Sequence, residues 1–304
     1  MAAALTTVPT MQFRPVEVPG DLAALQQLFE LCRTADGHWP LGEHKYLDLV
    51  AGGEGDGVGL VGEEGSELLA YTHLTPSREQ ARWTFEMAVH PLHRTVAAVE
   101  ETARTAISTA AGRGASGLAV WVFRPALAEV LHQLGFEEER ELRQLRRSLP
   151  PDERPDIPPE ISITGFRVGR DEEPWLELNN RAFAGHPENG AWDREVIDDR
   201  IAAPWFDPQG FRLAWRGTTL VGFCWTKLHS EDLGEIYIVG VAPESQRLGL
   251  GRVLTLVGLW DLAERQGATT AMLYVDAANI RGLRLYEGLG FYLDHVDRAL
   301  VLRW

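Results

Sequence analysis

The two halves of the chain repeat one order of apolar segments, and this duplication constrains the fold more than any other feature of the sequence. In the first half, WTFEMAVHP leads into a helical pattern, followed by GLAVWVF, the helix PALAEVLHQL and GFEEE. In the second half, GEIYIVGVAP leads into a helix, followed by TAMLYVD, NIRGLRLYEGL and GFYLD. Each half is far longer than a solenoid repeat, so the pattern predicts two tandem α/β domains related by internal duplication.

The start of each half repeats as well. A strand, a turn and an amphipathic helix are predicted for FRPVEVPGDLAALQQLFELC and again for ITGFRVGRDEEPWLELNNRAF. Alternating segments around a Gly-containing turn predict a hairpin in GVGLVGEEGSELLAYTHLTP and in FRLAWRGTTLVGFCWTKLHS. The predicted element order of each half is therefore β-α-β-β-β-α-β-α-β, which forms a mixed sheet with helices packed on it. We expect a flexible tail over 1–10, domains over 11–147 and 161–304, and a Pro-rich linker over 148–160.

The amino-acid composition restricts the kinds of partner that the protein can bind. With 304 residues, 45% hydrophobic and 24% charged, the chain can bury two cores. A net charge of −15 without a basic stripe disfavours nucleic acid. Cys32 and Cys224 are far apart, which predicts ordinary buried thiols in a reducing compartment and no metal site. Without a signal peptide or an apolar run of about 20 residues, we expect a cytoplasmic protein with no membrane partner. We also expect a monomer.

One loop between a strand and a helix carries chemical information. VAPESQRLGLGR places Gly249 and Gly251 where a helix begins. The first N–H groups of a helix are unpaired and lie at its electropositive end, and glycines let a phosphate approach them. Taken alone, the loop fits a tight turn equally well. No Gly-Lys-Ser/Thr follows, which excludes a P-loop. The loop comes after the fourth strand, whereas a dinucleotide fold would have it near the start of a βαβ unit.

These segments resemble the GNAT acyltransferase superfamily. The Gln-x-x-Gly-x-Gly loop is similar to its pyrophosphate motif, and DAANIRGLRLYEGLGF is similar to its Asn-containing helix and Tyr/Gly-Phe ending. The resemblance covers nearly all of each half. It is weaker in the first half, where Ala97 and Val99 replace the two glycines. Their side chains would crowd a phosphate, so we expect a degenerate or weak acyl-CoA site there.

Longer stretches are similar to the mycothiol acetyltransferase family, among them NNRAFAGHPENGAWD, GFCWTKLH and LYVDAANIRGLRLYEGLGF. The resemblance implies acetyl transfer from acetyl-CoA to the cysteinyl amine of a glucosaminyl-inositol, with the activity in the C-terminal domain. It also implies the acetyl-CoA contacts Val239, Gly240, Val241, Gln246, Arg247, Leu248, Gly249, Leu250, Gly251, Arg252, Asn279, Ile280, Arg281, Gly282, Leu283 and Arg284, with Met87, Ala88 and Val89 for a second acetyl-CoA in the first half.

Two residues are the candidate catalytic groups. Glu235 begins the strand EIYIVGV, where its carboxylate could take the ammonium proton; simple alternation puts it on the face of Tyr237 and Val239. Tyr286 could protonate the departing thiolate. Without the resemblance, Tyr286 would be interpreted as a core aromatic residue and Asn279 as a helix cap. Eight positions before Pro91, the offset of Glu235 from Pro243, lies Trp83, so the first half is expected to be inactive.

The acceptor contacts come from the resemblance alone. It implies that Asp36, Glu188, Lys227, Glu235 and Tyr274 bind the sugar, inositol or cysteinyl amine, which suits carboxylates for an ammonium and a lysine for hydroxyls. Because Asp36 belongs to the first half, the acceptor is expected between the two domains. Two other functions stay open: a tandem GNAT enzyme for another amine, such as an aminoglycoside or a polyamine, and a non-catalytic acyl-CoA sensor.

Overall fold

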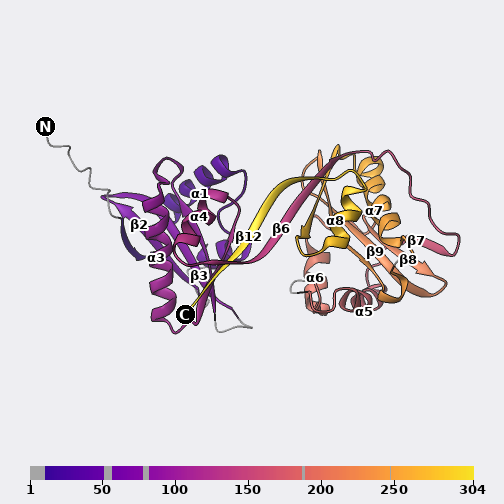
Figure 1. The fold of residues 1–304 in the computed structure, drawn as a ribbon, viewed down its shortest axis with the longest axis horizontal. Helices are drawn as coiled ribbons and strands as arrows, with labels where there is room; N and C mark the ends of the chain where they lie inside the picture. The colour runs from indigo at the N-terminus through magenta and orange to yellow at the C-terminus, as the bar shows by residue number, and fades with distance from the viewer. Residues whose placement is uncertain (1–10, 51–56, 78–81, 187–188, 247) are drawn as a thin grey trace. The chain divides into compact units, whose positions relative to one another are not determined.

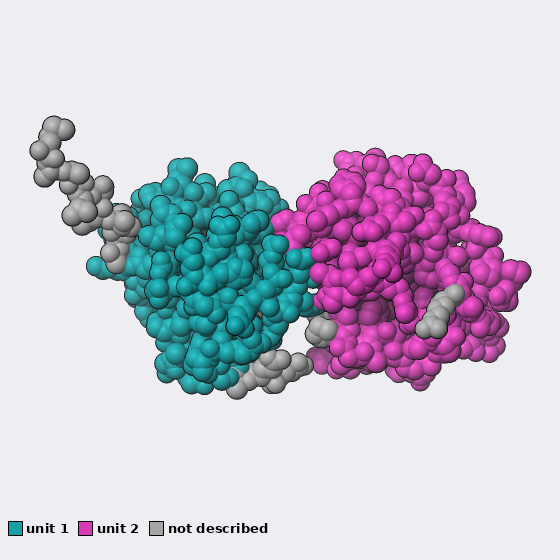
Figure 2. All heavy atoms as spheres, in the orientation of Figure 1, with its two compact units in different colours: residues 1–141, 297–304 teal, residues 142–296 magenta. Residues whose placement is uncertain are grey.

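The computed structural model describes residues 11–50, 57–77, 82–186, 189–246 and 248–304. The chain forms two compact units, drawn in two colours in Figure 2: unit 1 is Met1–Glu141 with Asp297–Trp304, and unit 2 is Leu142–Val296. The expected tail, 1–10, lies outside the described residues. Within the described ranges, no helix is long and apolar enough to cross a membrane.

Unit 1 is a mixed sheet in the order β1-β2-β3-β4-β5-β12, in which β4 and β5 are the parallel pair. Helices α3 and α4 pack on one face and α1 on the other. Ala103, Ala106 and Ala110 let α3 approach the sheet closely, and Thr95 caps its N-terminus. The elements are β1 (Gln12–Pro15), α1 (Leu22–Asp36), α2 (Glu43–Val50), β2 (Val58–Glu64), β3 (Glu67–Pro76), β4 (Trp83–Val89), α3 (Val96–Gly112), β5 (Gly117–Val122), α4 (Pro125–Gln133) and β12 (Tyr292–Arg303).

Unit 2 repeats this arrangement in the order β7-β8-β9-β10-β11-β6, with β10 and β11 parallel. Helices α7 and α8 cover one face of its sheet, and α5 and α6 lie toward the other (Figure 1). The elements are β6 (Glu137–Ser148), β7 (Ile161–Gly165), α5 (Glu172–Ala182), α6 (Arg194–Ala202), β8 (Phe211–Arg216), β9 (Thr219–Leu228), β10 (Leu233–Val241), α7 (Leu250–Trp260), β11 (Thr270–Asp276) and α8 (Ile280–Glu287).

The mixed α/β fold, its duplication and both hairpins are confirmed: β2–β3 in unit 1 and β8–β9 in unit 2. Each half also contains a second short helix, α2 or α6, that the sequence pattern did not predict. Helix α6 has a weak apolar stripe, since only Ile197 is buried in it.

The last strand of each half lies in the sheet of the other half. Arg298–Arg303 of β12 pair with β5, and Leu142–Ser148 of β6 pair with β11. The units therefore do not coincide with the halves that end at 147 and begin at 161. Duplicated halves carry similar last strands, and an antiparallel edge accepts either one, so the sequence pattern cannot distinguish the two pairings.

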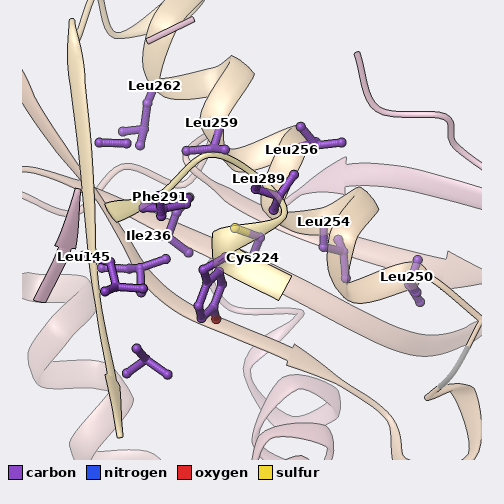
Figure 3. Packing of buried hydrophobic residues seen from close by; sticks show 14 of the residues in the cluster. Leu145, Cys224, Ile236, Leu250, Leu254, Leu256, Leu259, Leu262, Leu289 and Phe291 are labelled. Atoms are coloured by element: carbon purple, nitrogen blue, oxygen red, sulfur yellow. The ribbon is translucent and has the colours of Figure 1, made fainter. Parts of the chain in front are cut away.

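A hydrophobic core beneath α7 holds that helix against the sheet of unit 2. Cys224 of β9 and Ile236 of β10 pack in one cluster with Leu250, Leu254 and other α7 side chains (Figure 3). Both cysteines are free and buried, as predicted.

Between β6 and β7, the Pro-rich segment is neither helix nor strand. It is nevertheless attached to α7, because the Trp260 indole N–H donates to the Glu153 carbonyl, 2.8 Å away.

Candidate active site

The parallel strands of unit 2 separate at one residue. Only Leu233, Gly234 and Glu235 of β10 pair with β11, although β10 stays paired with β9 to its end at Val241. Among the described residues, no strand pairs with β10 on the β11 side beyond Glu235. Backbone polar groups need a partner, so this opening offers an extended ligand hydrogen bonds along β10.

Glu235 occupies the point of separation. It is 7% exposed, and its Oε2 lies 2.7 Å from Nε2 of His229. In the described part of the chain, Oε1 has no hydrogen-bond donor. A buried carboxylate is costly without a cationic partner. The free oxygen is therefore suited to receive an ammonium group from a ligand.

Lys227 stands opposite Glu235 in the β9–β10 ladder but does not neutralise it. Its ammonium nitrogen lies 4.5 Å from the centre of the Trp205 ring and 5.7 Å from that of Tyr237. These cation–π contacts hold the lysine away from the carboxylate. The Tyr237 hydroxyl is fixed in turn by Nε of Arg200, which donates to it at 3.0 Å.

A bulge in β10 corrects the expected strand alternation. The register shifts between Ile236 and Ile238, so Tyr237 and Ile238 both pack in the aromatic cluster on the α5 side. Ile236 and Val239 pack on the α7 side. The expectation that Val239 shares the face of Glu235 is therefore wrong, because the extra residue reverses the alternation.

The same bulge changes the comparison between the two halves. In unit 1 the parallel ladder joins Trp83 and Thr84 of β4 to β5 and then ends. Thr84 thus takes the ladder position of Glu235, one residue later than the sequence offset of Trp83 predicts. A hydroxyl cannot replace a carboxylate as a base at neutral pH.

The two loop glycines differ in why the chain needs them. Gly249 has a φ of +75° as the N-cap of α7, a conformation that side chains disfavour. A Cβ on Gly251 would meet Leu285 at 3.7 Å and Val241 at 3.9 Å, which are ordinary contacts. Packing within the chain therefore does not require a glycine at 251, and close approach of a ligand would explain it.

The glycine loop contacts the start of α8. Oε1 of Gln246 accepts a hydrogen bond from Nη1 of Arg281 at 3.0 Å, which joins the two segments expected to bind acetyl-CoA. Leu248 is exposed in this loop. Arg247 lies outside the described residues.

Arg252 is engaged within the protein. Its Nη1 donates to the Gly288 carbonyl at 3.2 Å, and its Nε donates to the Glu153 carboxylate at 3.3 Å. The hydrogen bond from Arg252 raises its own pKa and lowers that of Glu153. Arg252 must therefore leave or share these partners to contact a phosphate.

Helix α8 presents the remaining candidates. Asn279 caps it through Oδ1, which accepts from the Gly282 N–H at 2.9 Å. Tyr286 is buried, with its ring 5.8 Å from that of Phe291. Burial raises the pKa of Tyr286 above 10.0, so the phenol stays protonated at neutral pH. A protonated phenol is suited to donate a proton.

Glu235, Lys227 and Tyr274 are brought to one face of the unit 2 sheet. Met272 pairs with Glu235, and Tyr274 follows it two residues later on the same face. The Tyr274 hydroxyl, which accepts from Nε2 of Gln144 at 2.6 Å, belongs to a half-exposed side chain.

The two remaining acceptor candidates are Asp36 and Glu188. Asp36 lies in unit 1, where Nη1 of Arg94 and Nη1 of Arg124 contact Oδ1 at 2.8 and 2.6 Å. Two cations thus already bind this carboxylate. Glu188 lies outside the described residues.

The strand segment of unit 1 that matches Val239–Val241 is Met87, Ala88 and Val89. It also lies beyond the parallel ladder, but Nε of Arg94 donates to the Val89 carbonyl at 3.2 Å. At the position of the second glycine stands Val99, a buried residue of the first turn of α3. Unit 1 therefore keeps the strand opening and lacks the glycine loop.

His229 and Trp205 contact the candidate residues, but no sequence argument identified them. His229 follows β9 in the hairpin turn, and Trp205 follows α6. His229 could have been found from its position in the sequence, since it lies two residues after Lys227 and near the start of the strand that carries Glu235. Trp205 gave no such signal, because its loop contacts Lys227 only in the folded protein.

Known proteins resemble this chain in sequence and fold. A model of the Acetyltransferase (GNAT) family matches residues 173–291. Mycothiol acetyltransferase of Thermobispora bispora is 42% identical over 92% of this chain and 96% of its own. The same enzyme of Acidimicrobium ferrooxidans is 40% identical over 99% and 98%.

Two solved structures show the fold at lower identity. A tandem GNAT protein from the clavulanic acid biosynthesis pathway has a TM-score of 0.72 and 16% identity, with 96% of this chain and 98% of that chain covered. A GCN5-related N-acetyltransferase from Sphaerobacter thermophilus has a TM-score of 0.70 and 22% identity, covering 96% and 95%.

Proposed function

Because the chain belongs to the mycothiol acetyltransferase family, and so is an acetyl-CoA-dependent N-acetyltransferase with two tandem GNAT folds, we propose that it makes mycothiol. In this reaction acetyl moves to the cysteinyl amine of 1D-myo-inositol 2-(L-cysteinylamino)-2-deoxy-glucopyranoside, and CoA leaves. The observation that carries the proposal is the buried, half-satisfied carboxylate of Glu235 at the point where β10 and β11 separate.

The mechanism needs a base for the acceptor ammonium and an acid for the leaving sulfur. Oε1 of Glu235 takes the ammonium proton, and the neutral amine attacks the thioester carbonyl to give a tetrahedral intermediate. Tyr286 then protonates the thiolate as the carbon–sulfur bond breaks. The raised pKa of Tyr286 means that the phenol is protonated when this step begins.

The opening beyond Glu235 is proposed to bind acetyl-CoA. Gly251 supports this site because contacts within the chain leave room for a side chain there, whereas close approach of a ligand would exclude one. The proposed contacts are Val239, Gly240, Val241, Gln246, Arg247, Leu248, Gly249, Leu250, Gly251, Arg252, Asn279, Ile280, Arg281, Gly282, Leu283 and Arg284. A weaker second site in unit 1 would use Met87, Ala88 and Val89; calorimetry that finds more than one tight site per chain would contradict this ranking.

Acceptor binding is proposed for Asp36, Glu188, Lys227, Glu235 and Tyr274. The ammonium group of Lys227, which contacts the Trp205 ring, favours an acceptor with one cationic amine among many hydroxyls. A second cationic group of the acceptor would be repelled by this ammonium. A dense array of amines, as in a polyamine, fits this charge pattern less well.

The activity is proposed to reside in the second half, since the first half carries Thr84 at the ladder position of the base. We also propose a cytoplasmic monomer without nucleic-acid or membrane partners, in keeping with a net charge of −15. Light scattering would test the monomer.

Comparing kcat/KM for cysteinyl-glucosaminyl-inositol with an amine panel tests the acceptor. We expect that acceptor to exceed aminoglycosides and polyamines by at least about 100-fold, the scale of a site built for particular polar groups. A preferred polyamine would reject the proposal. CoA binding without thiol release for any amine would indicate a sensor instead.

A further inference from the structure

We propose that His229 is a positioning residue for Glu235: Nε2–H of its ring donates to Oε2 and turns Oε1 toward the acceptor amine. The proposal rests on the proposed function, since it assigns a partner to the same base. The contact itself is a 2.7 Å separation between His229 Nε2 and Glu235 Oε2.

Backbone hydrogen bonds place His229 and Glu235 close to each other. The His229 N–H donates to the Leu233 carbonyl at 2.9 Å, which closes the hairpin turn between β9 and β10. Glu235 follows Leu233 by two residues on the same strand, where β11 also pairs with it. Neither side chain needs a loop rearrangement to keep the contact.

Burial makes this hydrogen bond important for the carboxylate. The Glu235 side chain is 9% exposed, whereas that of His229 is 32% exposed. Lys227, the cross-strand neighbour, is held by Trp205 and supplies no hydrogen bond. Within the described residues, His229 is thus the donor that holds Glu235, and an imidazole N–H of fixed direction leaves one oxygen for the ligand.

Two variants distinguish the loss of the N–H donor from the loss of side-chain volume at position 229. His229→Leu removes the donor and should lower kcat about 10- to 100-fold, the effect of a hydrogen bond to a charged group, with KM for acetyl-CoA unchanged. His229→Gln can place its amide N–H near the former Nε2 and should recover kcat to within about threefold of wild type. His132→Gln, on the exposed face of α4 in unit 1, serves as the matched control and should have no effect.

Two kinetic outcomes would overturn the proposal. One is a His229→Leu variant with wild-type kcat, even if its thermal unfolding temperature falls, because that result assigns a structural role. The other is a His229→Gln variant as impaired as His229→Leu at equal stability, because the N–H donor would then be irrelevant.

A second readout does not depend on the acceptor. The ¹⁵N spectrum of His229 should show the neutral ring carrying its proton on Nε2, and Glu235→Gln should change that preference. A neutral ring protonated on Nδ1 would refute the contact. If wild type fails to acetylate cysteinyl-glucosaminyl-inositol, the proposed function fails, while this spectrum still decides the His229–Glu235 interaction.

Discussion

Replacing Glu235 by glutamine should abolish most turnover while leaving unit 2 folded. The change is isosteric and removes the only proton acceptor that the proposed mechanism assigns to the ammonium. Losing a general base costs about 10²-fold or more in kcat. At about 1.36 kcal/mol per factor of ten, this is about 2.7 kcal/mol of barrier.

We expect the free energy of unfolding to change less than the activation free energy of the reaction. Glutamine loses a charge-assisted hydrogen bond to His229 but also removes a charge that is 7% exposed. These effects oppose each other, so we expect the free energy of unfolding to change by no more than about 1 kcal/mol. Circular dichroism melting would measure this change.

The assay is CoA thiol release at saturating acetyl-CoA, with acetyl-CoA affinity measured separately by calorimetry. Glu231→Gln is the matched control, because Glu231 is exposed in the same hairpin. If Glu235→Gln turns over within about threefold of wild type, Glu235 is not the base and the reasoning from its free oxygen is wrong.

Further predictions concern the loop, the acid and the core. Gly251→Ala should raise the Kd for acetyl-CoA at least about tenfold by calorimetry without changing the melting temperature; unchanged affinity would remove the loop from the site. Tyr286→Phe should lower kcat about tenfold or more. Because burial raises the pKa of Tyr286 above 10.0, the unfolded chain ionises first, so stability should fall as pH rises past 10.0, and less steeply in this variant. Burial raises the pKa of Asp261, but hydrogen bonds from Arg265 and Arg212 outweigh it and lower the pKa below 3.8. This stabilisation should be present above pH 3.8 and lost as pH falls below it, and Asp261→Asn should destabilise by about 3 kcal/mol in urea melts at neutral pH.

Local sequence patterns were enough to predict the hairpins and the glycine loop, but they missed the short helices α2 and α6. Hairpin β8–β9 follows from alternation around a turn, and the loop before α7 follows from glycines at a strand–helix junction. Such signals depend on residues a few positions apart, so backbone geometry fixes them within the segment.

The sequence by itself determined that the fold is duplicated and which half kept its glycines. Only the tertiary structure decided which last strand completes each sheet, that a bulge at Tyr237 turns Val239 away from Glu235, and that His229 binds that carboxylate. Each of these depends on contacts between separate strands. Strand pairing is selected by the packing of the whole sheet, and a one-residue shift reverses the faces, so no local pattern can fix it.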